Sequence, residues 1–215
     1  YADGSQIPMT VTNYGFFGNN FFSRKPSFEY PKDRGYEHMV RGGLWVGAHA
    51  KLTTEFDGVV SGTVDAAQGP TSPEASEWTP GSLRVTKRST LPDSEFFDRN
   101  AVSELDVLSD YNDFTPTKAA SNSENHTPMN LVVHQETYQW NFAEFKNLLF
   151  VHFKITNRGP LLTNLWVGLY SELASGYKAN GKKGSGKAIG ITEFTKTVVV
   201  ADGRESPSGT FLVVR

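Results

Sequence analysis

Residues 131–173 contain three runs that read as β-strands and decide the fold. The runs are LVVHQETYQWNF (131–142), LLFVHFKITN (148–157) and LWVGLYSEL (165–173). They are rich in β-branched and aromatic residues, and short links with turn residues separate them. Consecutive strands joined by short links pair antiparallel. The sequence therefore predicts a three-stranded antiparallel meander in this part of the chain.

The first of these runs alternates between two kinds of face. Val133, Gln135, Thr137 and Gln139 share one face, and Val132, His134, Glu136, Tyr138 and Trp140 share the other. Successive side chains of a strand point to opposite faces of the sheet. Polar residues on one face suit a sheet that has one solvated side, as in a sandwich of two sheets.

Helical periodicity is almost absent from the rest of the chain. The exception is Ser94–Leu108, whose apolar residues follow a helical stripe and which reads as one short helix or an extended crossing. Further strands are expected over 42–52, 58–65, 188–200 and 210–215. The predicted fold class is an all-β antiparallel β-sandwich with long loops and at most one short helix.

The chain has 215 residues, which suits one domain over 1–215, or a subregion 1–90 packed on a meander 129–215. Aromatic residues make up 13% and glycines number 20, a composition typical of β proteins with many turns. The net charge is −2, which gives no reason to expect nucleic acid as a partner. No run of eighteen apolar residues exists, so no membrane insertion is expected.

Both ends suggest a processed or partial chain. The sequence begins with Tyr1 and ends inside the strand-like run TFLVVR (210–215), and it contains no cysteine. We expect a piece of a longer exported protein that is extracellular or at the cell surface after removal of a leader peptide. The absence of cysteine excludes disulfides and thiolate metal sites.

The stretch GKKGSGKA (181–188) matches a phosphate-binding loop at every position but the last. Ala188 stands where the hydroxyl that binds magnesium is needed, and the residues that follow favour a strand and not a helix. A phosphate loop depends on the helix N-terminus that follows it. We therefore interpret 178–190 as a mobile, basic hairpin loop and expect no nucleotide or other cofactor.

Two groups of residues are candidate metal ligands. Asp110, Asn112 and Asp113 place side-chain oxygens close together, which suits calcium, although the same residues also form turns without an ion. His134 and His152 lie on neighbouring predicted strands, with Glu136 on the face of His134, and we expect a hydrogen-bonded pair there more than a metal site. No residue set predicts a catalytic site.

Exposed aromatic side chains are the remaining candidates for ligand binding, because ring faces bind sugars or protein partners. Trp78 lies in the Pro- and Ser-rich loop 68–81, and it is the aromatic residue we most expect to be exposed. Most other aromatic residues are expected to fill the core.

Several blocks of the sequence share a family pattern. They are NYGFFGNN (13–20), PSFEYP (26–31), YEHMVRGGLWVGA (36–48), VVHQETYQWNF (132–142), FVHFKITNRG (150–159) and LWVGLYSELASG (165–176). Together they resemble the N-terminal region of large secreted or surface proteins of Bacteroidota and related environmental bacteria. The resemblance implies an exported module at the cell surface, with further β-sandwich modules downstream.

Three functions remain open at this point. The first is a non-catalytic structural, assembly or adhesion module at the cell surface, whose partners are other protein subunits or further copies of the chain. The second is a carbohydrate-binding module that binds polysaccharide, which an exposed coplanar row of aromatic rings would favour. The third is a glycoside hydrolase with unidentified carboxylates, which two carboxyl groups facing each other across a cleft would favour.

Overall fold

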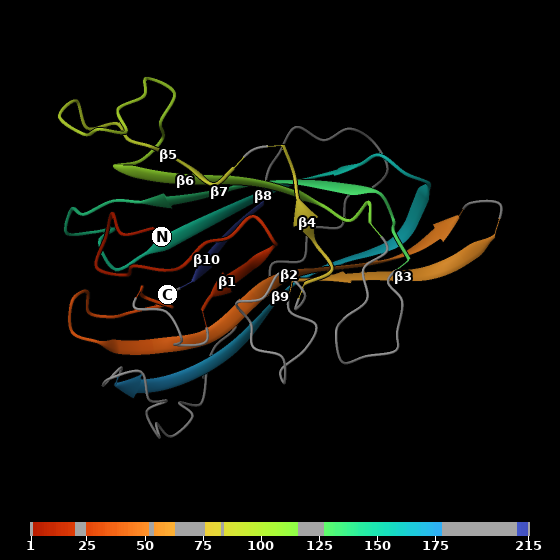
Figure 1. The fold of residues 1–215 in the computed structure, drawn as a ribbon, viewed down its shortest axis with the longest axis horizontal. Coiled ribbons are helices and arrows are strands. Elements are labelled where there is room, and N and C mark those ends of the chain that lie inside the picture. The colour runs from red at the N-terminus through yellow and green to blue at the C-terminus, as the bar shows by residue number, and fades with distance from the viewer. Residues whose placement is uncertain are drawn as a thin grey trace.

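A computed structural model of the chain describes residues 2–19, 25–51, 54–62, 76–82, 84–115, 127–177 and 210–214 (Figure 1). For residues 61, 174–177 and 210–214, only the backbone is considered. The described strands are β1 (Phe16–Gly18), β2 (Tyr36–Lys51), β3 (Glu55–Ser61), β4 (Thr79–Pro80), β5 (Thr86–Arg88), β6 (Leu105–Asn112), β7 (Leu131–Gln139), β8 (Leu149–Asn157), β9 (Leu161–Tyr177) and β10 (Thr210–Val214).

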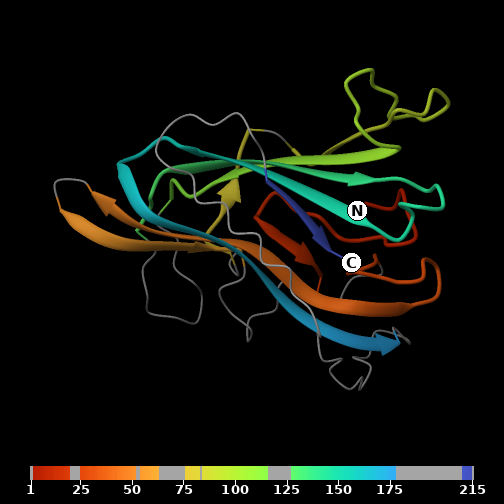
Figure 2. The ribbon, with the colours of Figure 1, turned by 180° about the vertical axis from the view of Figure 1, so that it is seen from behind.

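The strands form two layers that face each other (Figures 1 and 2). In the four-stranded sheet, β2 pairs with β9 along one edge and with β1 and β3 along the other. The six-stranded sheet has the order β10-β8-β7-β6-β4, with β5 also paired to β6. All these pairings are antiparallel and no helix occurs among the described residues, so the prediction of an all-β antiparallel sandwich is confirmed.

The predicted meander is correct for β7 and β8 but wrong for its third strand. After β8 the chain turns at Arg158-Gly159-Pro160, and β9 then pairs with β2 in the other sheet. Pro160 has no N–H and cannot donate a hydrogen bond to a neighbouring strand. The side chain of Asn157 closes the turn, because its Oδ1 accepts from Gly159 N and its Nδ2 donates to Pro160 O. The second edge of β8 is occupied by β10, and the second edge of β7 by β6.

The segment Ser94–Leu108 forms turns followed by the start of β6, which confirms the extended alternative and excludes the helix. Asp106 fixes this turn, because its carboxylate accepts hydrogen bonds from Val102 N at 2.9 Å and from Ser103 N at 2.8 Å. Such side-chain bonds to nearby backbone groups compete with helix formation. Phe97 and Val102, two of the apolar residues that formed the predicted helical stripe, are exposed.

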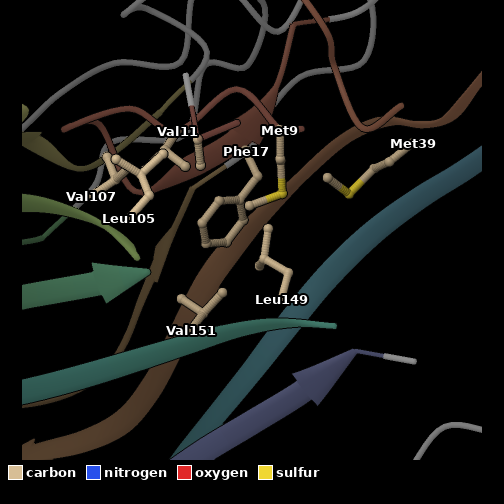
Figure 3. Packing of buried hydrophobic residues seen from close by; sticks show 9 residues of the cluster. Met9, Val11, Phe17, Met39, Leu105, Val107, Leu149 and Val151 are labelled. Carbon is tan, nitrogen blue, oxygen red and sulfur yellow. The ribbon is translucent and has the colours of Figure 1, made fainter. Parts of the chain in front are cut away.

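Two apolar clusters fill the space between the sheets. One contains Leu44, Val46, Ala48, Val60, Trp78, Tyr111, Met129, Leu131 and Val133. The other contains Phe17, Met39, Leu105, Val107, Leu149 and Val151 from the sheets, together with Ala2, Met9 and Val11 from the segment before β1 (Figure 3). The N-terminal segment therefore supplies part of the core, and both ribbon views show it between the two layers.

Gln139 holds this N-terminal segment in place. The amide oxygen of Gln139 accepts from Gly4 N at 2.9 Å, and its amide nitrogen donates to Ser5 Oγ at 2.9 Å and to Ile7 O at 2.7 Å. Gln139 is completely buried, and each of these bonds satisfies a polar group that is shielded from water. The inner face of β7 thus carries a structural polar contact as well as apolar packing.

The prediction that Trp78 is exposed is wrong, because its side chain is 0% exposed. The indole packs edge-on against Tyr111, with ring centroids 5.2 Å apart, and its Nε1 donates to Leu44 O at 2.9 Å. Gly15, at φ +68°, lets the backbone approach the indole so closely that a Cβ there would lie 2.3 Å from Trp78 Cδ1. A buried indole cannot offer a ring face to a ligand.

Several expectations concern residues outside the described ranges. They are the stretch GKKGSGKA (181–188) with its loop 178–190, the strand 188–200, and residues 68–75 of the loop expected over 68–81. The strand expected over 210–215 is confirmed as β10, which pairs antiparallel with β8.

Candidate functional site

Two exposed tryptophans and one half-buried tyrosine share the outer face of the four-stranded sheet. Trp45 comes from β2, and Trp166 and Tyr170 come from β9. Their alternating neighbours Val46, Val167 and Leu169 point into the core, so the three rings project from the opposite side of the sheet. Trp166 is 62% exposed and Trp45 is 39% exposed. We refer to these three residues as the aromatic face.

The register of β2 and β9 places each of these rings opposite a glycine. Trp45 pairs with Gly168, Trp166 pairs with Gly47, and Tyr170 pairs with Gly43. The pattern arises because the same tetrapeptide, LWVG, occurs at 44–47 and at 165–168 and the two copies pair antiparallel around Val46 and Val167. Across the β2–β9 pairing, each ring therefore faces only a glycine, and on its other edge Trp45 pairs with Ser61 of β3.

The rings also follow one line along the strands. Trp45 lies diagonally between Trp166 and Tyr170, and diagonal neighbours on a sheet are about 7–8 Å apart. The rings of Trp45 and Tyr170 are nearly parallel, with an interplanar angle of 18° and centroids 5.6 Å apart. Trp166 and Tyr170 are four residues apart on β9, which corresponds to about 13 Å along the strand.

Charged pairs flank the aromatic face at both ends of the strands. At one end Arg41 Nε donates to Glu172 Oε2 at 2.6 Å. At the other end His49 Nδ1 contacts Asp57 Oδ1 at 2.9 Å, and Lys51 Nζ lies 3.2 Å from Glu55 Oε1. The hydrogen bond with Asp57 raises the pKa of His49 from its usual value of 6.5. Acidic and basic groups therefore compensate each other around the rings.

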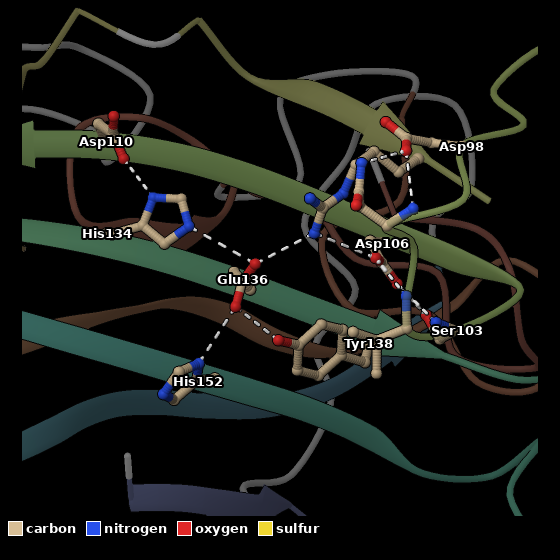
Figure 4. A network of polar contacts seen from close by, with 11 residues as sticks. Asp98, Ser103, Asp106, Asp110, His134, Glu136, Tyr138 and His152 are labelled. Atoms are coloured by element: carbon tan, nitrogen blue, oxygen red, sulfur yellow. Dashed lines mark hydrogen bonds and ion pairs between the residues drawn. The ribbon is translucent and has the colours of Figure 1, made fainter. Parts of the chain in front are cut away.

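A second group of polar residues lies on the outer face of the six-stranded sheet, centred on Glu136 (Figure 4). Tyr138 Oη donates to Glu136 Oε2 at 2.6 Å, and His152 Nδ1 contacts the same oxygen at 3.2 Å. Arg88 Nη2 donates to Glu136 Oε1 at 3.1 Å, and His134 Nε2 lies 3.5 Å from that oxygen. We call these five residues the Glu136 network.

The prediction that His134 and His152 lie on neighbouring strands is confirmed, and both side chains contact Glu136. The register pairs Glu136 directly with His152, and His134 also contacts Asp110 Oδ1 at 2.6 Å through Nδ1. Among the described residues, no group of three or more His, Asp or Glu side chains is arranged to hold a metal ion.

Burial raises the pKa of the Glu136 carboxyl, but the hydrogen bonds with Tyr138 and His152 and the nearby His134 outweigh burial and lower it from the usual 4.5. Burial and the bond to Glu136 raise the pKa of Tyr138. A carboxylate with a lowered pKa is a weak base, whereas a general base works best with a pKa near the working pH. The Glu136 network therefore fits a structural role better than proton transfer.

The Glu136→Gln substitution is expected to lower the free energy of unfolding by about 1–3 kcal/mol at pH 7, because hydrogen bonds to a charged group are lost. The folded-state pKa lies below the unfolded one, so this contribution is present above the unfolded pKa, near 4.5, and is lost as the pH falls through the folded pKa. Thermal unfolding between pH 3 and pH 7 checks this: the difference between wild type and variant should shrink on acidification. A difference that stays constant over this range would contradict it.

The structure does not bring the calcium candidates Asp110, Asn112 and Asp113 together around one point. Asp110 contacts His134, and Asn112 Oδ1 accepts from Phe114 N and from Thr79 Oγ1. Asp113 follows β6 on its inner side, is 0% exposed, and accepts hydrogen bonds from Met129 N and Leu131 N. The pleat of the strand separates Asp113 from the other two side chains.

Sequence reasoning did not single out Trp45 and Trp166, although a signal for them was present. The repeated LWVG tetrapeptide marks two strands with the same alternation of core and surface residues. If these two strands pair antiparallel, each tryptophan faces a glycine. The pairing itself could not be read locally, because β2 and β9 are more than 100 residues apart in the sequence.

No protein-family model, curated protein or solved structure matches this chain. The resemblance to secreted proteins of Bacteroidota therefore stays a prediction. Within the described residues, no helix is long and apolar enough to span a membrane.

Proposed function

We propose that this chain is a non-catalytic adhesion or assembly module of an exported protein, and that it contacts its partner through the aromatic face. The observation that carries the proposal is the group of three aromatic side chains, Trp45, Trp166 and Tyr170, which project from the same face of one sheet. Exposed aromatic groups surrounded by polar residues are typical of binding surfaces. Their place on two long, paired strands gives the surface a rigid support.

The engagement of the Glu136 carboxylate also supports a non-catalytic module. Both of its oxygens already have partners within the sheet, and its pKa is lowered. The sequence suggests two classes of partner for the module, which are protein subunits, including further copies of the chain, and polysaccharide.

The proposal is tested with the double variant Trp45→Ala/Trp166→Ala and the control Phe97→Ala. Phe97 is a similarly exposed aromatic residue, but it lies in the loop between β5 and β6 on the six-stranded side of the molecule. Self-association is measured by light scattering after size-exclusion chromatography, and retention is measured on insoluble polysaccharides.

We expect wild type and the Phe97→Ala control to show the same association in at least one of these assays and the double variant to lose it. Circular dichroism of all three proteins verifies that the fold is retained. Equal behaviour of the double variant and wild type in both assays would contradict a role of the aromatic face.

A further inference from the structure

We infer that the partner of the aromatic face is a neutral, extended polysaccharide chain that lies along the strands across Trp166, Trp45 and Tyr170. This inference rests on the proposed function and names the chemical class of its partner. It follows from the shape of the row, from its charge and from its area.

The shape of the row fits a narrow, extended ligand. The three side chains follow the direction of β2 and β9 over about 13 Å. A Cβ added at Gly168, which lies opposite the central Trp45, would meet no atom within 4 Å, so the surface is open at the middle of the row. A chain of sugar rings presents C–H faces at regular intervals, and such faces pack on aromatic rings.

Polar groups beside the row can form hydrogen bonds with the hydroxyl groups of such a chain. The partly exposed carboxylate of Glu172 lies beyond Tyr170, whereas its partner Arg41 is buried, and His49, Asp57 and Thr163 lie beyond Trp166. Carboxylates accept hydrogen bonds, the Thr163 hydroxyl can donate them, and a hydroxyl group of a sugar does both. Sugar recognition needs this combination of apolar ring faces with hydrogen-bonding groups at the edges.

The charge around the row favours a neutral chain over a polyanionic one. Among the described residues, each basic side chain at the two ends has an acidic partner, namely Arg41 with Glu172, Lys51 with Glu55 and His49 with Asp57. A chain of uronic acids or sulfated sugars would meet these carboxylates, and the described part of this face offers no surplus of positive charge to offset the repulsion between like charges.

The area of the row argues against a protein as the partner. An aromatic side chain offers about 150–250 Å² when fully exposed, so three partly exposed rings present on the order of a few hundred Å². A stable protein interface buries about 800 Å² on each partner around an apolar centre. Val59 and Leu161 add exposed apolar side chains to this face, but the rings alternate with glycines and are bounded by charged pairs, so the apolar centre stays small.

Binding is measured by isothermal titration calorimetry and by tryptophan fluorescence, with oligosaccharides of β-1,4-linked glucose, xylose and mannose from two to six sugars long. Alginate serves as the polyanionic chain. The variants are Trp45→Ala, Trp166→Ala and Gly168→Thr, with Phe97→Ala as the control. Gly168→Thr keeps all three rings but places a side chain at the open middle of the row, at a position where a Cβ meets no neighbour.

We expect at least one neutral series to bind, with affinity that rises with chain length until the ligand spans the row. Trp45→Ala, Trp166→Ala and Gly168→Thr should each weaken binding at least about tenfold, and Phe97→Ala should leave it unchanged within about twofold. Thermal unfolding verifies that Gly168→Thr is folded, so that its loss of binding reports on the surface of the row.

Three results would overturn the inference. Preferential binding of alginate would show that the ligand is not neutral. Absence of binding to every sugar, together with self-association that Trp45→Ala abolishes, would make the partner a second copy of the chain and leave the proposed function intact. Absence of both would refute the proposed function as well.

Discussion

The substitution Trp78→Ala is expected to lower the free energy of unfolding by about 3–5 kcal/mol, the usual cost of removing a large buried aromatic side chain. Trp78 is completely buried between the sheets, where it contacts Tyr111 and leaves no room for a Cβ at Gly15. The variant would leave a cavity, because backbone on both sides limits collapse. The lost hydrogen bond adds little, since Leu44 O still accepts from Gly62 N at 2.9 Å.

The effect is measured by urea unfolding followed by circular dichroism, and Trp45→Ala is the matched control. Trp45 is the same residue type on the outer face, where it is partly exposed and stacks on Tyr170, so its removal should cost no more than about 1.5 kcal/mol. Trp78→Phe should fall between wild type and Trp78→Ala. If Trp78→Ala were as stable as Trp45→Ala, Trp78 would not be a core residue.

The second large effect is expected for Asp113→Ala, which should lower the free energy of unfolding by about 2–5 kcal/mol. The buried carboxylate of Asp113 accepts hydrogen bonds from Met129 N and Leu131 N, and so connects the end of β6 to the start of β7. Its removal leaves two buried N–H donors without an acceptor, and each such group costs about 1–3 kcal/mol.

Asn112→Ala is the control for this variant, because Asn112 precedes Asp113 but lies on the outer face, where its bonds are exposed or half-buried. Its effect on urea unfolding should be below about 1 kcal/mol. The same proteins are also unfolded in the presence of millimolar calcium. A calcium-dependent rise in the melting temperature that is present in wild type and absent in Asp113→Ala would make Asp113 a metal ligand and contradict its structural role.

Local sequence patterns predict individual strands well in this protein and predict their partners poorly. The alternation of residues in β7 and β8 was visible because each strand carries its own two-sided pattern. The pairing of β9 could not be predicted in this way, because its partner β2 is far away in the sequence. The short turn after β8 would equally suit a hairpin between β8 and β9. Pairing of distant strands depends on the summed burial of both sheets, which no short segment encodes.

The candidate functional residues show the same contrast between local contacts, which the sequence predicts, and burial in the assembled fold, which it does not. Trp78 was predicted to be exposed because the segment around it is polar and rich in proline, yet the indole is the largest fully buried side chain among the described residues. Burial is a property of the assembled sandwich, and local composition misjudged it. The contact of His134 and His152 with Glu136 was predictable, because it requires only two adjacent strands joined by a short turn.

The position of the N-terminal segment between the two sheets determines when the core can form. Gly4, Ser5 and Ile7 bond to Gln139, which follows them by 135, 134 and 132 residues respectively. During synthesis these residues leave the ribosome long before β7 and β8 exist, so they remain without their partners while most of the chain is made. Contacts between residues far apart in the sequence slow folding, because the chain loses the entropy of closing a long loop before the stabilising hydrogen bonds form. This half of the core therefore assembles only late, after the chain has been produced through β8.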